Sequence, residues 1–118
     1  GIEVRDGLIT GDPEETGTNE RRKLSQVGSV VVTVLVDARG EIVSEPQAAL
    51  FGLPETDEDG DDMEDIVIDE VIHALESIPK NRRKNLDVVA EAARRAARAA
   101  VRDCWGKKPL TQALVARV

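Results

Sequence analysis

The sequence predicts a small α/β protein of the α+β two-layer kind, in which a three-stranded sheet is faced by two helices in the order β-β-α-α-β. Three observations predict this fold. The chain has 118 residues, the size of one domain, and 41% of them are hydrophobic. Aromatic residues contribute only 2%, so we expect an aliphatic core. Stretches in which hydrophobic residues follow the pattern of strands flank two stretches in which they follow the 3.6-residue repeat of helices.

Three strands are expected. Residues 29–37 are apolar at both alternating sets of positions, which is typical of a strand that is central or covered on both faces. After a turn at Gly40, a second strand is expected over about residues 41–53. Pro46 cannot donate a hydrogen bond to a neighbouring strand, which favours a sheet edge or a bulge. Residues 110–118 alternate in polarity and predict the third strand.

Two helices are expected between the second and third strands. An acidic loop over residues 55–65 leads into the first helix, which is predicted to begin near Asp61 or Asp62 and to end before Pro79. Its apolar positions span about half of the circumference, so we expect it to pack on the sheet and on another helix. The second helix is predicted over about residues 85–104.

The N-terminal residues 1–20 are rich in Gly, Thr, Asp and Glu. A short hairpin around Asp6 and Gly7 is conceivable there. We interpret the stretch as a linker or as the tail of a preceding domain.

Charge is distributed unevenly along the chain, whose formal net charge is −7. Residues 1–78 hold 5 basic and 20 acidic side chains, whereas residues 79–108 hold 10 basic and 3 acidic ones. A positive region could contact nucleic acid or an acidic protein. The acidic remainder repels phosphate and therefore argues against indiscriminate binding to nucleic acid.

Several classes of protein are disfavoured. The sequence has no apolar run of about 18 residues and no signal-peptide pattern at its start, so we expect a soluble protein without a membrane partner. Its single cysteine, Cys104, excludes an internal disulfide framework and indicates a reducing compartment. A cytoplasmic location is therefore expected.

Candidate catalytic groups and metal ligands are scarce, because the chain has one His and one Cys. His73 falls on the polar face of the first helix, among acidic residues, which favours a solvated surface histidine over a catalytic or metal-binding one. Cys104 falls on the apolar face of the second helix, which indicates a buried and unreactive thiol. The sequence therefore predicts no catalytic residue in this chain.

The acidic loop matches only part of the calcium-binding loop of an EF-hand. Alignment on Gly60 places Glu55, Asp57 and Asp59 at the first, third and fifth positions. The twelfth position, which requires a bidentate Glu, is Ile66. A solvated loop is the favoured interpretation, and no metal ligand is predicted.

The best candidates for contact with RNA or an acidic partner are four arginines on one flank of the second helix: Arg94, Arg95, Arg98 and Arg102. Asp87 and Glu91 share this arc, and Glu91 can pair with Arg95. A solvated, partly self-paired surface is therefore the alternative. The chain has no Tyr, so it lacks the stacking platforms that are common in readers of single-stranded RNA.

Candidates for self-association lie on both predicted helices: Val88, Ala92 and Ala99 on the second, and Ile68 and Ile72 on the first. The strip on the second helix has small side chains that would let another backbone approach closely. An unpaired edge of the sheet could also pair with a second copy of the chain.

Four segments follow one another in an order that is specific as a set. They are Glu20–Ser25 with Gly28, the valine strand ending in Asp37 and Gly40, Phe51–Pro54 before the acidic loop, and Asp87–Ala92 followed by Trp105–Pro109. Together they resemble the C-terminal domain of ribonuclease J over about residues 20–118. Gln26, where an aromatic is expected, and Cys104 are departures from that pattern.

The resemblance implies a bacterial parent enzyme of the metallo-β-lactamase and β-CASP family, which degrades RNA from its 5′ end, can cut internally, and uses two zinc ions. The family's His-any-His-any-Asp-His signature is absent here, so the resemblance implies no catalytic residue and no cofactor in this chain. It implies a C-terminal accessory domain at residues 21–118, after a linker or catalytic-domain tail at 1–20. The implied partners are the chain's own catalytic domain, further copies in a dimer or tetramer, and RNA through the parent enzyme.

Overall fold

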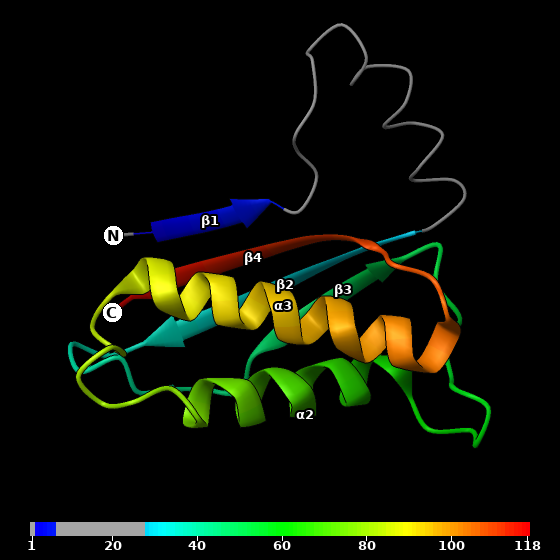
Figure 1. The fold of residues 1–118 in the computed structure, drawn as a ribbon, viewed down its shortest axis with the longest axis horizontal. Helices are drawn as coiled ribbons and strands as arrows, with labels where there is room; N and C mark the ends of the chain where they lie inside the picture. Colours follow the sequence, from blue (N-terminus) through cyan, green and yellow to red (C-terminus); the bar gives the residue numbers. More distant parts are fainter. Residues whose placement is uncertain (1, 7–27) are drawn as a thin grey trace, which may run out of the picture.

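A computed structural model describes residues 2–6 and 28–118 as a layer of strands and a layer of helices (Figure 1). The elements in chain order are β1 (Ile2–Asp6), β2 (Ser29–Val36), β3 (Gln47–Phe51), α2 (Met63–Glu76), α3 (Leu86–Trp105) and β4 (Leu110–Arg117). The predicted order β-β-α-α-β is confirmed by β2 through β4.

The sheet has the order β1-β4-β2-β3. β2 and β4 run parallel, whereas β1 pairs with β4 and β3 with β2 in antiparallel fashion. The valine-rich β2 therefore occupies an inner position and β3 an edge, as the sequence predicts. The parallel pair is possible because the two helices carry the chain across the sheet between β2 and β4 (Figure 1).

Two details of the sheet differ from the prediction. The strand expected over 41–53 is wrong in extent, because regular pairing covers only Gln47–Phe51. Pro46 precedes the paired segment, and before it Ile42 makes a single isolated bridge to Val36. Ile2–Asp6, interpreted as part of a linker, forms a fourth strand along the edge of β4. The rest of the conceivable N-terminal hairpin lies outside the described residues.

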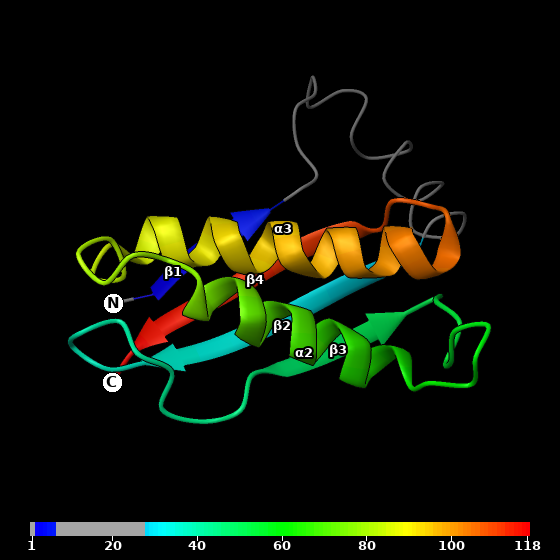
Figure 2. The ribbon, with the colours of Figure 1, turned by 60° about the horizontal axis from the view of Figure 1, so that its bottom comes forward.

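Both helices begin and end where their capping residues predict. Asp62 caps α2 by accepting a hydrogen bond from the backbone N–H of Glu64, and Asn85 caps α3 through the N–H of Asp87. Gly106 ends α3 in the left-handed conformation, with φ of 82°. The two helices lie side by side on one face of the sheet (Figure 2), and α2 contacts both α3 and β3, as its wide apolar surface predicts.

The core lies between the helices and one face of the sheet. Alternate residues of the inner strands point into it: Val30, Val32, Val34 and Val36 of β2, and Thr111, Ala113 and Val115 of β4. The helices contribute aliphatic side chains and alanines, as the low aromatic content predicts. Six of these residues of α3 are fully or almost fully buried: Val89, Ala90, Ala93, Ala97, Ala100 and Val101. The small side chains let α3 lie close to the strands.

Candidate interaction surfaces

The sheet face opposite the helices is an open face, because no element within residues 2–6 and 28–118 covers it. Its inner-strand members pair side by side as Val31 with Gln112, Thr33 with Leu114, and Leu35 with Ala116. β3 extends the same face through Ala49, opposite Val31, and Phe51, opposite Ser29. Residues 29–37 are apolar at both alternating sets of positions, and the structure places one set in the core and the other on the open face.

Large apolar side chains are exposed on this open face. Leu35 is 40% exposed and Phe51 is 58% exposed. Val43, which donates its backbone N–H to the carbonyl of Leu35 at 3.0 Å, is also exposed. Exposed apolar side chains that share one surface are typical of a contact site. Sequence reasoning missed this surface because periodicity shows that both faces are apolar, but not that both helices lie on the same one.

The four arginines predicted to contact RNA or an acidic partner do lie along α3, but three of them have acidic partners. The carboxylate of Glu91 accepts a bidentate pair of hydrogen bonds from the guanidinium of Arg94, at 2.7 and 3.0 Å. It accepts a third hydrogen bond from Arg95 at 2.9 Å. Arg102 contacts Asp103 at 3.3 Å. Within the described part of the chain, Arg98 alone of the four makes no ion pair. The flank is therefore partly neutralised by its own helix.

These contacts shift the pKa values of the paired groups. Hydrogen bonds from Arg94 and then Arg95 lower the pKa of Glu91 to about 2, against an opposing effect of partial burial. The same contact raises the pKa of Arg94, whose side chain is only 15% exposed. Arg95 is 76% exposed and keeps much of its surface for other contacts. The cluster is a local structural ion pair with one exposed cation.

The residues predicted to mediate self-association are distributed over the two helices. Ile68 is buried, with 7% exposure, and Ile72 and Ala99 are half-buried. Val88 and Ala92 are half-buried and pack against the core, and they also line a shallow hollow of about 370 Å³ beside Glu91. None of the five is among the exposed large apolar side chains of the described residues, and their role stays a prediction.

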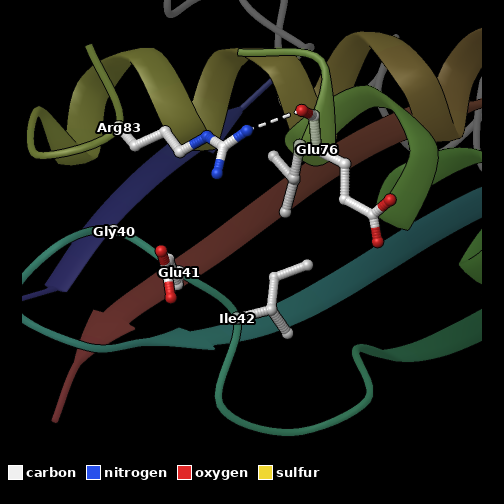
Figure 3. Close-up of a pocket in the computed structure, with 6 residues that line it drawn as sticks. Gly40, Glu41, Ile42, Glu76 and Arg83 are labelled. Carbon is white, nitrogen blue, oxygen red and sulfur yellow. Dashed lines mark hydrogen bonds between the residues drawn. The ribbon is translucent and has the colours of Figure 1, made fainter. Parts of the chain in front are cut away.

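A second charged region, the basic end, joins two segments that are far apart in the sequence. It consists of Arg39 from the turn after β2 and Lys80, Arg83 and Lys84 from the loop between α2 and α3, together with Glu41 and Asn81 around a hollow of about 400 Å³. An adjoining hollow of about 240 Å³ lies between Gly40, Ile42 and the end of α2 (Figure 3). Sequence reasoning noted the charge of residues 79–108 but not this contact with Arg39.

Three carboxylates of the acidic loop come together in the structure. Oxygens of Asp57, Asp59 and Asp61 lie within 4.8 Å of one another, and they are the one such cluster within the described residues. An oxygen of Asp57 accepts backbone hydrogen bonds from Asp59 and Asp61 at 2.9 and 2.8 Å, so it holds the turn together. The cluster consists only of carboxylates, whereas protein zinc sites rely on His and Cys.

Neither the single histidine nor the single cysteine belongs to that cluster. His73 is exposed near the end of α2, as predicted. Cys104 is half-buried against the core, and burial, with the nearby carboxylates of Asp57 and Asp103, raises the pKa of its thiol. The predicted burial of Cys104 is therefore only partial, and its unreactive role stays a prediction. No helix within the described residues has the length and apolar character required to cross a bilayer.

The fold and these surfaces define a class of protein: a small two-layer α+β module that offers an open sheet face and a basic end for contact. A family model described as the ribonuclease J C-terminal domain matches residues 18–118. The chain belongs to this family. It is also 45% identical over 114 residues to a ribonuclease J of Sinorhizobium meliloti, covering 97% of this chain. The chain spans 20% of the length of that relative.

Proposed function

We propose that this chain is a non-catalytic domain of a zinc-dependent ribonuclease J-type enzyme and that it supports assembly of the parent enzyme. The observation that carries this proposal is the open face of the sheet, where Leu35 and Phe51 are exposed beside Val31 and Leu114. An apolar face of this kind loses unfavourable contact with water when a second protein surface covers it. Family membership and the similarity to ribonuclease J supply the nuclease context.

The occupant that we propose for the open face is a second copy of the same domain. A sheet face can meet its own symmetry mate with the same residues on both sides, which is the commonest arrangement in homo-oligomers. The open face carries few charges, since its paired positions are Val31, Thr33, Leu35, Gln112 and Leu114. Two identical faces can therefore approach without repulsion between like charges.

The test is the mass of the full-length enzyme in solution, measured by light scattering over a range of concentrations. Leu35→Glu places a charge in the open face at an exposed position, so it should shift the protein to smaller species without unfolding it. Ala99→Glu on the helix layer is the matched variant, because Ala99 belongs to the strip predicted from sequence. If only Ala99→Glu abolishes assembly, the interface lies on the helix layer and not on the open face. A wild-type enzyme that is strictly monomeric would refute the assembly role.

A second candidate function is contact with RNA through the α3 flank. The exposure of Arg95, at 76%, supports it, because this guanidinium can reach a phosphate while remaining near Glu91. Replacing Arg94, Arg95, Arg98 and Arg102 by Gln should then weaken RNA binding and flatten its dependence on salt. An unchanged salt dependence would remove this candidate.

A further inference from the structure

The loop between α2 and α3 is a rigid support for basic side chains. Its backbone turns are closed by hydrogen bonds from the N–H of Arg82 to the carbonyl of Pro79 at 2.9 Å and from Asn85 to Arg82 at 3.1 Å. Arg83 turns back to α2 and donates to the carbonyl of Glu76 at 2.6 Å (Figure 3). It also donates to the carbonyl of Ile78 at 2.7 Å. Arg83 thereby satisfies carbonyls at the helix end.

The side of the loop nearest the sheet is also anchored. Arg117 of β4 donates a hydrogen bond to the carbonyl of Lys84. Arg83 and Arg117 thus fix the loop, whereas Lys80 and Lys84 are exposed and make no ion pair within the described residues. Of the loop cations that line the hollow, Lys80 and Lys84 therefore remain available for an external anion.

Gly40 brings a third cation to this loop. Its backbone has φ of 84°, and a Cβ atom there would lie 1.9 Å from the carbonyl oxygen of Arg83. The turn after β2 therefore rests directly on the backbone of the loop. Asp37 closes this turn by accepting hydrogen bonds from the N–H groups of Arg39 and Glu41, at 2.8 and 3.0 Å. This contact positions Arg39 beside Lys80 and Lys84, around the hollow described above.

The charges around this hollow favour an anionic ligand with several negative groups. Four cations line it, and Glu41 is the one acidic residue among its lining residues. On the α3 flank, in contrast, the carboxylates of Glu91 and Asp103 already offset part of the charge of the four arginines. Charges that are not compensated within the protein contribute most to binding a polyanion, because they replace its counterions.

The positions of the aromatic side chains indicate which part of a nucleic acid the basic end could contact. The chain's two aromatics end β3, at Phe51, and α3, at Trp105, whereas the basic end lies where α2 ends and α3 begins (Figures 1 and 2). No base-stacking platform therefore adjoins the basic end. Contact there would follow the sugar-phosphate backbone and would carry no sequence preference.

From this geometry we propose that the basic end, through Arg39, Lys80 and Lys84, binds the backbone phosphates of single-stranded RNA. The choice of RNA rests on the proposed function, because a ribonuclease must hold this polyanion as its substrate. The acidic remainder of the chain, with 20 acidic side chains in residues 1–78, repels phosphate and disfavours indiscriminate binding over the rest of the domain.

The test compares two triple variants of the full-length enzyme with equal changes in charge. Arg39→Gln, Lys80→Gln and Lys84→Gln alter the basic end but leave the anchoring Arg83 and Arg117 intact. Arg95→Gln, Arg102→Gln and Lys108→Gln remove three exposed cations from α3 and the residues after it. Binding of a fluorescent, nuclease-resistant 2′-O-methyl oligouridylate is followed by anisotropy over a series of salt concentrations, and thermal melting checks that all variants are folded.

The basic-end variant should lower the slope of log affinity against log salt by about 2, because each contact with a single strand contributes about 0.7. Between about 50 and 200 mM salt, the loss of affinity should then be about 20-fold smaller than in the wild type. The α3 variant should keep the wild-type slope; a reduction confined to that variant would place the RNA contact on the α3 flank, the second candidate above, and would overturn the proposal. An unchanged slope in the basic-end variant, or an equal reduction in both variants, overturns the proposal.

Two further measurements distinguish this proposal from binding of an acidic protein and from the proposed function. Poly-L-glutamate, which carries carboxylates in place of phosphates, should displace the oligonucleotide poorly, and displacement equal to that by unlabelled RNA would refute RNA as the preferred ligand in favour of an acidic protein. Degradation of unmodified RNA and the mass in solution are measured on the same preparations. A wild-type protein that neither degrades RNA nor assembles refutes the proposed function, whereas active, assembled enzyme with an unchanged slope refutes only the contact at the basic end.

Discussion

Substitution of Gly40 by Ala tests the contact that joins the β2 turn to the loop between the helices. Two penalties apply. A side chain at φ of 84° costs about 1 kcal/mol, although a stiffer unfolded chain offsets part of this cost. The added Cβ would also lie 1.9 Å from the carbonyl oxygen and 2.6 Å from the Cβ of Arg83. Relief requires movement of backbone, which costs about 2 kcal/mol more.

Gly60→Ala is the matched control, because Gly60 has φ of 86° and no atom within 4 Å of an added Cβ. The free energy of unfolding should therefore fall by about 3 kcal/mol in Gly40→Ala and by about 1 kcal/mol in Gly60→Ala. Urea denaturation of the 118-residue chain, followed by circular dichroism, measures both values. Equal destabilisation by the two substitutions would show that the turn does not press on the loop and would refute the reasoning.

Two other predictions concern the ion pair and the core. Glu91→Gln should lower the free energy of unfolding by about 1 kcal/mol at neutral pH. This is less than the pKa shift of Glu91 alone would give, because Arg95 is exposed and solvent screens its charge. Since folding lowers the pKa of Glu91 from 4.5 to about 2, this stabilisation is present above pH 4.5 and should disappear as pH falls toward 2; a difference that is constant with pH would contradict it. Val32→Ala, at a fully buried position of β2, should lower the free energy of unfolding by about 2 kcal/mol. Thr33→Ala, at an exposed position on the open face, should change it by less than about 0.5 kcal/mol. Similar losses for the two variants in urea denaturation would contradict the assignment of the two faces.

The elements of this fold were predictable because each has a local signal. Asp62 and Asn85 accept hydrogen bonds at the starts of α2 and α3, and Gly106 ends α3, so the chemistry of single residues sets the helix limits. β3 was predicted too long, since its length depends on how far the edge can pair after Pro46. Ile2–Asp6 gave only a weak strand signal, and its pairing is decided by the free edge of β4, which lies far away in the sequence.

The candidate surfaces were harder to predict, because they depend on which layers meet. The alternation of Val31 and Leu35 with Val32 and Val34 shows two apolar faces, but only the tertiary arrangement leaves one of them open. The α3 arginines and the pairing of Glu91 with Arg95 were both visible in the sequence, whereas the two hydrogen bonds from Arg94 to Glu91 depend on side-chain conformations. Sequence spacing therefore located the charge and one ion pair, but not which cations remain unpaired.

The basic end illustrates how a candidate binding surface can arise from two weak local signals. Gly40 indicates a turn, and the run from Lys80 to Lys84 indicates a solvated loop, and neither signal alone predicts a binding site. The structure joins them because the glycine lacks the Cβ that would collide with Arg83. The open face and the basic end are therefore physically separate in origin: the first depends on helices lying on one side of the sheet, the second on a close contact between two turns. Assembly and RNA contact should accordingly respond to different substitutions in this domain.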